Sequence, residues 1–417
     1  MFYFLGLKGK WNMKVLVVGG YGAQGSVICT YLARSPDVSE IVCAGRNLEK
    51  AKQLVERLKS DKVTAKKLDA TNADELTAAA KGMDLVVNAT VPKYNLIIMD
   101  AVLKGGANYQ DLASGPTDIP MDQFVSKQLE RSKKYEDAGL TALINTGSSP
   151  GVMNVLARHG ADKLDKVNEI KIRYTGFMET KEFISIWSPE TAWADMAEEP
   201  FLFEDGKLKR VSPFSGQEVY VFPEPFGPQT VVHHHHEEVV TLPRFIGKGL
   251  KYVDFKMGDA DILTVKAIWE IGLLNDKPVN VKGVKVIPRD VFLSAIPPPL
   301  TMEEVEQKIK EGILVDAAEC GVVEITGEKA GKRTRYTYEW PTLSIREANK
   351  IIPGSTQESY ATGVPAAIFA WMLGKGEIKN TGVIAPECLE LEARNTFLSK
   401  LAEMKQPAYE KVETILS

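Results

Sequence analysis

The stretch VLVVGGYGAQGSVI, residues 15–28, decides the fold of this chain. Its first half belongs to a β-branched apolar run that predicts a buried strand over Lys14–Val18. Its second half predicts a helix over Ala23–Ala33, and a short glycine-rich turn joins the two. A strand, a tight turn and a helix in this order are typical of the first unit of a βαβ fold.

Three glycines of this turn have the spacing G-x-G-x-x-G. Gly20 permits the tight turn, Gly22 lets a pyrophosphate approach the backbone, and Gly25 lets the helix pack close to the strand. The free N–H groups and the positive dipole end of the helix, at Ala23 and Gln24, then hold the phosphate charge. The turn therefore predicts a bound dinucleotide, and the alternative is a purely structural turn in a nucleotide-free sheet.

Apolar runs and amphipathic stretches alternate regularly from Met13 to about Asn145. This alternation predicts an α/β fold with a doubly wound parallel sheet of the Rossmann type. The predicted strands are Lys14–Val18, Glu40–Ala44, Val63–Leu68, Asp84–Asn88, Asn108–Leu112 and Leu140–Ile144, and the later helices are Leu48–Leu58, Ala73–Ala80, Ile97–Leu103 and Met121–Asp137.

Beyond about Gly147, strand-like segments cluster, and Pro and Gly interrupt residues 212–228 heavily. This texture predicts a second, α+β domain with a mixed or antiparallel sheet. Its predicted strands are Glu169–Tyr174, Glu218–Phe222, Glu238–Leu242 and Arg333–Glu339, and the helices are Val152–Leu164, Ile262–Leu274, Met302–Glu311, Gly363–Leu373 and Leu389–Lys405.

These patterns divide the chain into four parts. We expect an N-terminal extension (1–12), a nucleotide-binding domain (13–147), a second domain (148–360), and C-terminal helices that pack back on the body (361–417). Met13 directly precedes the first strand and is an alternative start to Met1, in which case the first twelve residues carry no function.

Charge and cysteine content exclude several classes of protein. The 51 Lys and Arg residues face 55 Asp and Glu residues, so the chain lacks the basic field that nucleic-acid binding requires. The four cysteines are widely spaced, which argues against a disulfide framework or a cysteine-based zinc site and indicates a reducing, cytoplasmic location. No apolar run approaches the roughly 18 residues of a membrane span, and the N-terminus lacks the layout of a signal peptide.

The end of the second predicted strand distinguishes between the two nicotinamide cofactors. NAD sites commonly place Asp or Glu there, whereas this chain has AGRN at residues 44–47. Arg46 can bind a ribose 2′-phosphate with its planar fork, so NADP(H) is preferred and NAD(H) remains possible; a solvated surface charge is the alternative for Arg46. Further cofactor contacts are expected where the third and fourth strands end, at Asp69, Ala70, Ala89 and Thr90.

Taken together, the motifs resemble the saccharopine dehydrogenase-like family, which includes saccharopine reductases, lysine 6-dehydrogenases and carboxynorspermidine dehydrogenases. The resemblance implies NAD(P)-dependent oxidation or reduction at a carbon–nitrogen bond of an amino acid, and a homodimer built largely on the second domain. The motifs are GGYGAQG (19–25), AGRN-x-x-KA (44–51), KLDAT (67–71), DLVVNATVP (84–92), GANYQDLA (106–113), SPGV (149–152), ISIWSPETAW (184–193), HHEEVVTLPRF (235–245), and TGVPAAI with GVIAPE (362–387).

Such a reaction needs a general acid or base and a site for the substrate carboxylate. Asp111 follows the fifth strand at the sheet edge where ligands bind and matches the family's Tyr-x-Asp position, so it is one catalytic candidate; a turn or N-cap aspartate is the alternative. His236 is the other catalytic candidate, because imidazole titrates near neutrality.

The segment that leaves the sixth strand supplies the substrate-side candidates. The resemblance implies that its Pro-Gly step lies beside the nicotinamide, with Gly147 on the cofactor side; a crossover turn is the alternative. Of Arg173, Arg210 and Arg244, the last is favoured for the substrate carboxylate. The predicted substrate residues are Ser149, Pro150, Gly151, Trp187 and Arg244.

A run of four histidines, residues 233–236, raises the question of a metal. In a strand, His233, His235 and Glu237 would share one face and form a conceivable metal set. The family needs no metal, so we expect none.

Three functions remain open. The leading one is an amino-acid dehydrogenase or imine reductase that acts on lysine, saccharopine or a related diamine-derived substrate. The second joins an amine to an aldehyde, as carboxynorspermidine formation does. The third is a non-catalytic NADP(H)-binding sensor, which would bind cofactor without turning over a substrate.

Overall fold

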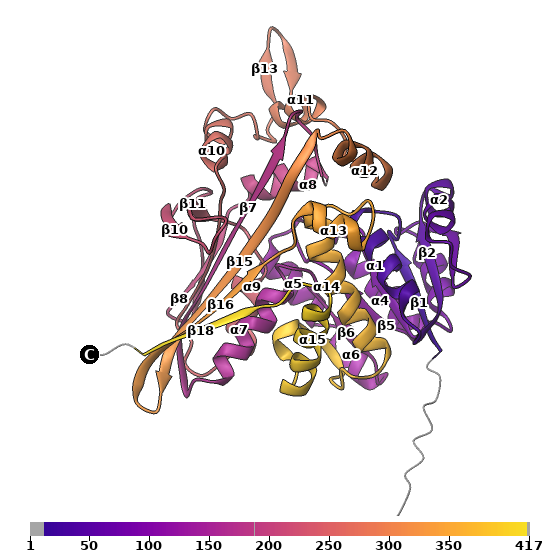
Figure 1. Ribbon diagram of the computed structural model, residues 1–417, viewed down its shortest axis with the longest axis horizontal. Coiled ribbons are helices and arrows are strands. Elements are labelled where there is room, and N and C mark those ends of the chain that lie inside the picture. The colour runs from indigo at the N-terminus through magenta and orange to yellow at the C-terminus, as the bar shows by residue number, and fades with distance from the viewer. Residues whose placement is uncertain (1–11, 187, 415–417) are drawn as a thin grey trace, which may run out of the picture.

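The computed structural model describes residues 12–186 and 188–414, which fold around two large sheets (Figure 1). Trp187 and residues 1–11 of the expected extension lie outside the described residues. In the part of the chain that the model describes, no helix has the length and apolar character needed to cross a membrane.

The N-terminal sheet is parallel throughout, and its seven strands have the order β17-β6-β5-β4-β1-β2-β3. The predicted Rossmann-type sheet is thus confirmed, and its strand order reverses between β1 and β4. Its elements are β1 (Met13–Val18), α1 (Ala23–Arg34), β2 (Val38–Gly45), α2 (Leu48–Leu58), β3 (Val63–Lys67), α3 (Ala73–Ala80), β4 (Leu85–Asn88), η1 (Pro92–Tyr94), α4 (Asn95–Gly105), β5 (Asn108–Asp111), α5 (Met121–Leu129), α6 (Ser132–Asp137), β6 (Thr141–Leu143) and β17 (Gly382–Ile384).

The predicted single helix over Met121–Asp137 is wrong in its continuity. The structure divides it into α5 and α6. The backbone at Arg131 departs from α-helical hydrogen bonding. The Arg131 guanidinium donates to the Lys127 carbonyl and to Asp100, and the Arg131 backbone N–H donates to the Gln128 carbonyl, three residues back. A side chain therefore uses the carbonyl that a continuous helix would need.

The second sheet is mixed, as predicted, and has nine strands. Its two longest strands, β7 and β15, pair antiparallel along most of their length, whereas β12 runs parallel to β7 (Figure 1). Of these nine strands, only β7, β10 and β16 were predicted from the sequence. The strands are β7 (Lys166–Thr180), β8 (Phe201–Glu204), β9 (Lys207–Arg210), β10 (Glu218–Val221), β11 (Pro228–His233), β12 (Tyr252–Met257), β15 (Leu314–Lys329), β16 (Lys332–Pro341) and β18 (Tyr409–Thr414).

The prediction of a strand over Glu238–Leu242 is wrong, because this segment forms the first turns of helix α9 (Glu238–Phe245). Its β-branched residues favour a strand locally, but the helix buries Val239, Val240 and Leu242 in the main core, so tertiary packing overrides the local preference. The other helices are α7 (Val152–Asp162), α8 (Pro189–Ala197), α10 (Ile262–Glu270), α11 (Pro288–Ser294), α12 (Met302–Lys310), α13 (Ile345–Ile351), η2 (Pro386–Cys388) and α15 (Leu391–Glu403).

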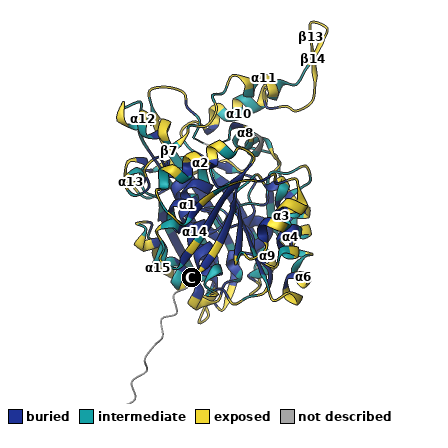
Figure 2. Cartoon of the chain, turned by 90° about the vertical axis from the view of Figure 1, so that its right-hand side faces the viewer, coloured by how far each residue is buried: buried dark blue, intermediate teal, exposed yellow. Residues whose placement is uncertain are grey.

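Helix α14 (Gln357–Gly374) connects the two sheets. It is buried along most of its length, packs on α1, and is followed by β17, which completes the N-terminal sheet beside β6. Figure 2 shows the resulting buried interior and the short, exposed hairpin of β13 (Val279–Val281) and β14 (Val284–Val286), which projects from the periphery beyond α11 (Pro288–Ser294). One hydrophobic cluster includes Val15 and Val27 of the first domain and Ile172 and Val323 of the second.

Candidate active site

The glycine turn brings β1 and α1 into direct contact. Gly19 has φ +81°, and a Cβ there would lie 2.6 Å from the Ala89 carbonyl oxygen. A Cβ at Gly25 would overlap the Gly19 carbonyl oxygen, and one at Gly20 would lie 2.9 Å from Cys43 Sγ. The left-handed residue of the turn is thus Gly19, which the sequence analysis did not single out, because the motif begins one residue later.

The amino end of α1 fits a diphosphate. Its N-cap, Gly22, provides no side-chain acceptor, and a Cβ at Gly22 would meet only the Gly19 carbonyl oxygen, at 3.2 Å. The first-turn N–H groups at Ala23 and Gln24 are therefore not capped by a side chain, and backbone can approach a ligand closely. The Gln24 side chain donates to Glu358 Oε1 at 2.7 Å.

The ends of β2 and β3 carry the residues predicted for the adenosine side. Arg46 is exposed directly after β2, where the Tyr21 hydroxyl accepts from the Asn47 N–H at 2.9 Å. Asp69 is exposed and accepts from the Thr71 N–H and hydroxyl; these bonds, together with the Arg46 charge, lower the Asp69 pKa. Ala70 is buried beside it.

At the end of β4, the buried Asn88 fixes the loop that contains Ala89 and Thr90. Its Oδ1 accepts from the Thr90 N–H at 3.0 Å and from the Thr90 hydroxyl at 2.6 Å. This loop abuts the glycine turn, since the Ala89 carbonyl lies beside Gly19.

Asp111 lies at the end of β5 and is 1% exposed. Its Oδ2 accepts from Asn95 Nδ2 at 3.1 Å, the Tyr109 hydroxyl at 3.0 Å and Gln128 Nε2 at 2.7 Å, and its Oδ1 accepts from the Asn145 N–H at 2.8 Å. Burial raises the Asp111 pKa to about 7 against these bonds. Both oxygens are engaged, so the geometry suits a group that orders neighbouring loops better than one that contacts a substrate.

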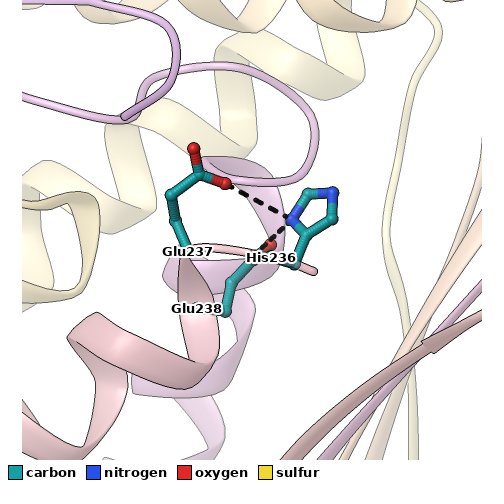
Figure 3. A group of neighbouring side chains, drawn as sticks. All are labelled: His236, Glu237 and Glu238. Atoms are coloured by element: carbon teal, nitrogen blue, oxygen red, sulfur yellow. Dashed lines mark hydrogen bonds and ion pairs between the residues drawn. The ribbon is translucent and has the colours of Figure 1, made fainter. Parts of the chain in front are cut away.

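His236 lies between two carboxylates (Figure 3). Its Nδ1 is 2.7 Å from Glu238 Oε2 and 3.7 Å from Glu237 Oε2, and its ring stacks on Phe255 of β12 with centroids 4.0 Å apart. Burial lowers the His236 pKa, but the Glu238 charge and hydrogen bond outweigh it and raise that pKa to about 9. The ring is therefore an imidazolium at neutral pH.

The two glutamates attach this imidazolium to the loops of the first domain. Glu237 Oε1 accepts from the Ser114 N–H at 2.7 Å and the Gly115 N–H at 3.0 Å, in the loop after β5. Glu238 accepts from the Ser149 hydroxyl, in the segment after β6. The cluster thus lies on the side where the strands β5 and β6 end.

The segment from Gly147 to Gly151 forms a tight turn before α7. The Gly147 N–H donates to the Pro150 carbonyl at 2.6 Å, and the Gly151 N–H donates to Asn154 Oδ1 at 2.9 Å. Of the predicted residues, Ser149 contacts Glu238, and Pro150 and Gly151 follow it in the same turn.

The arginines do not gather with these residues, contrary to the expectation for Arg244. Arg244 is exposed and donates to Ser126 Oγ at 3.0 Å on α5. Arg173 is buried on the second sheet, paired with Asp254 and Glu218, and Arg210 is exposed near Glu199. Each guanidinium thus already has partners of its own.

The conceivable metal set His233, His235 and Glu237 is not assembled, because β11 ends at His233 and the following residues lead into α9. Among the described residues, the atoms of His236, Glu237 and Glu238 lie within 4.8 Å of one another. These atoms already form the ion pair and the backbone bonds described above, so the arrangement suits an imidazolium better than a metal ligand.

The structure adds three residues that the sequence analysis missed. Tyr174 of β7 donates to Glu319 Oε2 of β15 at 2.7 Å, and its hydroxyl lies 3.4 Å from Ser148 Oγ. Glu358, at the start of α14, accepts from Gln24 of the glycine turn. No sequence signal could have found them, because they come from distant segments that only the fold brings together.

A surface hollow lined by Asp84, Asn108, Leu140 and Lys375, among others, lies at the opposite edge of the N-terminal sheet, where β4, β5 and β6 begin. Ligands of such sheets bind where strands end. The hollow is therefore not the cofactor site.

A parallel sheet with a diphosphate-fitted glycine turn and an ionisable cluster at the same edge defines a nicotinamide-dinucleotide-dependent oxidoreductase. The chain belongs to the saccharopine dehydrogenase family: residues 15–143 match its NADP-binding domain and residues 147–406 match its C-terminal domain. It is therefore an NAD(P)-dependent oxidoreductase that acts on a carbon–nitrogen bond.

Two relatives match nearly the whole chain. Carboxyaminopropylagmatine dehydrogenase of Synechocystis sp. is 28% identical over 411 residues, which cover 96% of this chain and 98% of the relative. Carboxynorspermidine synthase of Vibrio alginolyticus is 27% identical, covering 91% of this chain and 92% of the relative.

Two solved structures share the fold. Saccharopine dehydrogenase (L-Glu forming) of Saccharomyces cerevisiae has a TM-score of 0.69 at 16% identity and covers 97% of this chain and 100% of its own. Homospermidine synthase of Legionella pneumophila, solved with NAD, has a TM-score of 0.67 at 15% identity and covers 96% of this chain and 91% of its own.

Proposed function

We propose that this chain uses NADP(H) to form, or in reverse to cleave, the secondary-amine bond of a carboxyalkylated polyamine. An amine and an aldehyde lose water to give an imine, and a hydride and a proton then convert the imine to the secondary amine. This is the amine–aldehyde reaction of the sequence analysis, and we prefer it to lysine or saccharopine oxidation. The names and the nearly full-length match of the two relatives support it.

The observation that carries this proposal is the charge of the candidate site. Carboxyl groups occur there in two pairs, Glu237 with Glu238 and Glu319 with Glu358, whereas Arg173, Arg210 and Arg244 are engaged elsewhere. Arginine forks are the groups that bind amino-acid carboxylates best, and carboxylates are the groups that bind ammonium ions. The acidic site therefore favours a polycationic amine over saccharopine, which has several carboxylates.

In the proposed reaction, His236 supplies the proton. Its raised pKa, about 9, keeps the ring protonated at neutral pH, and Glu238 orients it through Nδ1. The nicotinamide, when bound, supplies or accepts the hydride. Gly147, Ser149, Pro150 and Gly151 form the wall between this imidazolium and the cofactor side.

The cofactor would be held by the residues of the three strand ends. We assign the diphosphate to Gly20, Gly22, Ala23, Gln24 and Gly25, and the preference for NADP(H) over NAD(H) to Arg46. The exposed position of Arg46 after β2, where no carboxylate follows the strand, supports this preference. Asp69, Ala70, Ala89 and Thr90 complete the proposed contacts.

We further propose a homodimer and a cytoplasmic location. Phe177 and Met178 of β7 and Val219 and Val221 of β10 expose between 39% and 71% of their surface on the second domain, as an apolar interface requires. The four cysteines are unpaired thiols, consistent with a reducing compartment. Sedimentation equilibrium should give twice the chain mass.

The proposed function is tested by oxidation of NADPH at 340 nm with pairs of amines and aldehydes. We expect oxidation that requires both partners, with diamines or agmatine as the amine. Oxidation by lysine with an oxo acid alone would instead favour the saccharopine-type reaction. Tight NADPH binding with no turnover for any pair would favour the sensor.

A further inference from the structure

A second carboxyl pair lies apart from the His236 cluster. Glu319 of β15 and Glu358 of α14 are both partly buried. In addition to burial, the Glu319 charge raises the Glu358 pKa, and the charges of Glu319 and Glu358 raise the Tyr174 pKa. Burial is the main cause that raises the Glu319 pKa to about 7 and the Glu358 pKa to about 8. Neither pKa is lowered by a neighbouring cation, so the pair has no counter-charge among the described residues.

The atoms with spare hydrogen-bonding capacity around this pair are acceptors. Glu358 Oε1 accepts from Gln24, but its Oε2 is buried and receives no hydrogen bond from the described residues. Gln357, whose side chain lowers the Glu319 pKa, is 3% exposed and likewise has an Oε1 without a donor. Buried acceptors without donors are costly, so they call for a ligand that brings several N–H groups.

The pair also lies next to the start of α1, where the cofactor is proposed to bind, and to the segment after β6. Gln24, which donates to Glu358, belongs to the first turn of α1. Thr362 of α14 lies close to Gly147: a Cβ added to Gly147 would be 3.1 Å from the Thr362 methyl group. Ser148 Oγ is 3.4 Å from the Tyr174 hydroxyl, whereas the next residue, Ser149, donates to Glu238. Two consecutive serines thus connect the carboxyl pair to the His236 cluster.

We infer that Glu319, Glu358 and Gln357 form a cation subsite that holds the distal ammonium or guanidinium group of the amine substrate while the other amino group reacts beside His236. This inference rests on the proposed function, because it divides one polycationic substrate between two acidic clusters. Glu319 and Glu358 supply the charge, Gln357 supplies a neutral acceptor, and Tyr174 holds Glu319 in place.

The test compares binding of 1,3-diaminopropane and of n-propylamine to the enzyme saturated with NADP⁺, by titration calorimetry at pH 8.5. The wild type should bind the diamine at least about tenfold more tightly, the gain expected from one charge-assisted hydrogen-bonded pair. Glu319→Gln and Glu358→Gln should remove this difference and leave NADP⁺ affinity unchanged. Glu328→Gln is the matched control, because Glu328 is on the same strand as Glu319 but its side chain is 47% exposed and paired with Lys166.

Discrimination that persists in both glutamine variants, or that is lost equally in Glu328→Gln, would overturn the subsite, as would a wild type that binds both amines alike. Diamine affinity should also rise between pH 6 and pH 8.5, since the raised pKa values of the pair require deprotonation first. Binding needs no turnover, so the two proposals fail separately. Discrimination without amine-dependent NADPH oxidation would refute the proposed function alone, and oxidation without discrimination would refute the subsite alone.

Discussion

The protonation of His236 determines the pH dependence that we expect. The ring is charged below its pKa of about 9 and loses its proton above it. Reductive turnover, which needs a proton donor, should therefore fall as pH rises through about 9, and oxidative turnover should rise over the same range. His236→Asn should flatten both profiles and lower kcat by about 10²–10⁴-fold. An unchanged profile in that variant would assign the titration to another group.

The preference for NADPH over NADH can be tested at a single side chain, Arg46. Arg46→Asp places a carboxylate where NAD-binding relatives of this fold have one and repels a 2′-phosphate. The ratio of kcat/KM for NADPH to that for NADH should fall by roughly 10–100-fold, the value of one or two charge-assisted hydrogen bonds. A ratio that does not move would show that Arg46 is only a solvated charge.

Asp111 distinguishes positioning from catalysis. Asp111→Asn would point an amide group at donors such as Tyr109 and Gln128, leaving buried donors unmatched at a cost of about 1–3 kcal/mol of unfolding free energy. We expect lower stability and a lower kcat, with KM for NADPH little changed. Chemical denaturation and steady-state kinetics measure both, and loss of kcat at full stability would instead support a direct role for Asp111.

At the scale of elements, the turn between β1 and α1 offers a paired experiment. In Gly25→Ala the added Cβ meets the backbone of Gly19 and Gly20, which cannot move aside, so the protein should lose about 1–3 kcal/mol of stability or more. In Gly22→Val the side chain points toward the expected diphosphate, so NADPH binding should disappear while the melting temperature without cofactor stays near that of the wild type. Retained NADPH affinity in folded Gly22→Val would refute this placement.

Elements with strong local signals could be predicted from the sequence. Asn47 and Asn72 cap α2 and α3, accepting from the Lys50 and Glu75 N–H groups, and such caps can be read from the sequence because capping depends only on neighbouring residues. The segment Glu238–Leu242 was mispredicted because burial, not local preference, decides its conformation. The three-residue strand β17 was missed because it exists only by pairing with β6.

At the scale of the whole molecule, the candidate site joins segments that are far apart in the sequence. The glycine turn and the strand ends could be found from the sequence, because the parallel sheet places them along one edge. Tyr174, Glu319 and Glu358 could not, since the antiparallel register of β7 and β15 and the docking of α14 on α1 bring them together. The packing of α9 against α5 places Arg244 beside Ser126 on the surface, against expectation.

In the proposed reaction, hydride from NADPH reaches the carbon of a newly formed carbon–nitrogen bond. The most direct measurement uses NADPH deuterated at nicotinamide C4 on the transferred face, with a diamine and a carboxyl-bearing aldehyde, and mass spectrometry of the products. We predict a secondary amine that carries one deuterium on the carbon attached to the new nitrogen. A deuterated alcohol from simple aldehyde reduction, or an amine without deuterium, would contradict the account.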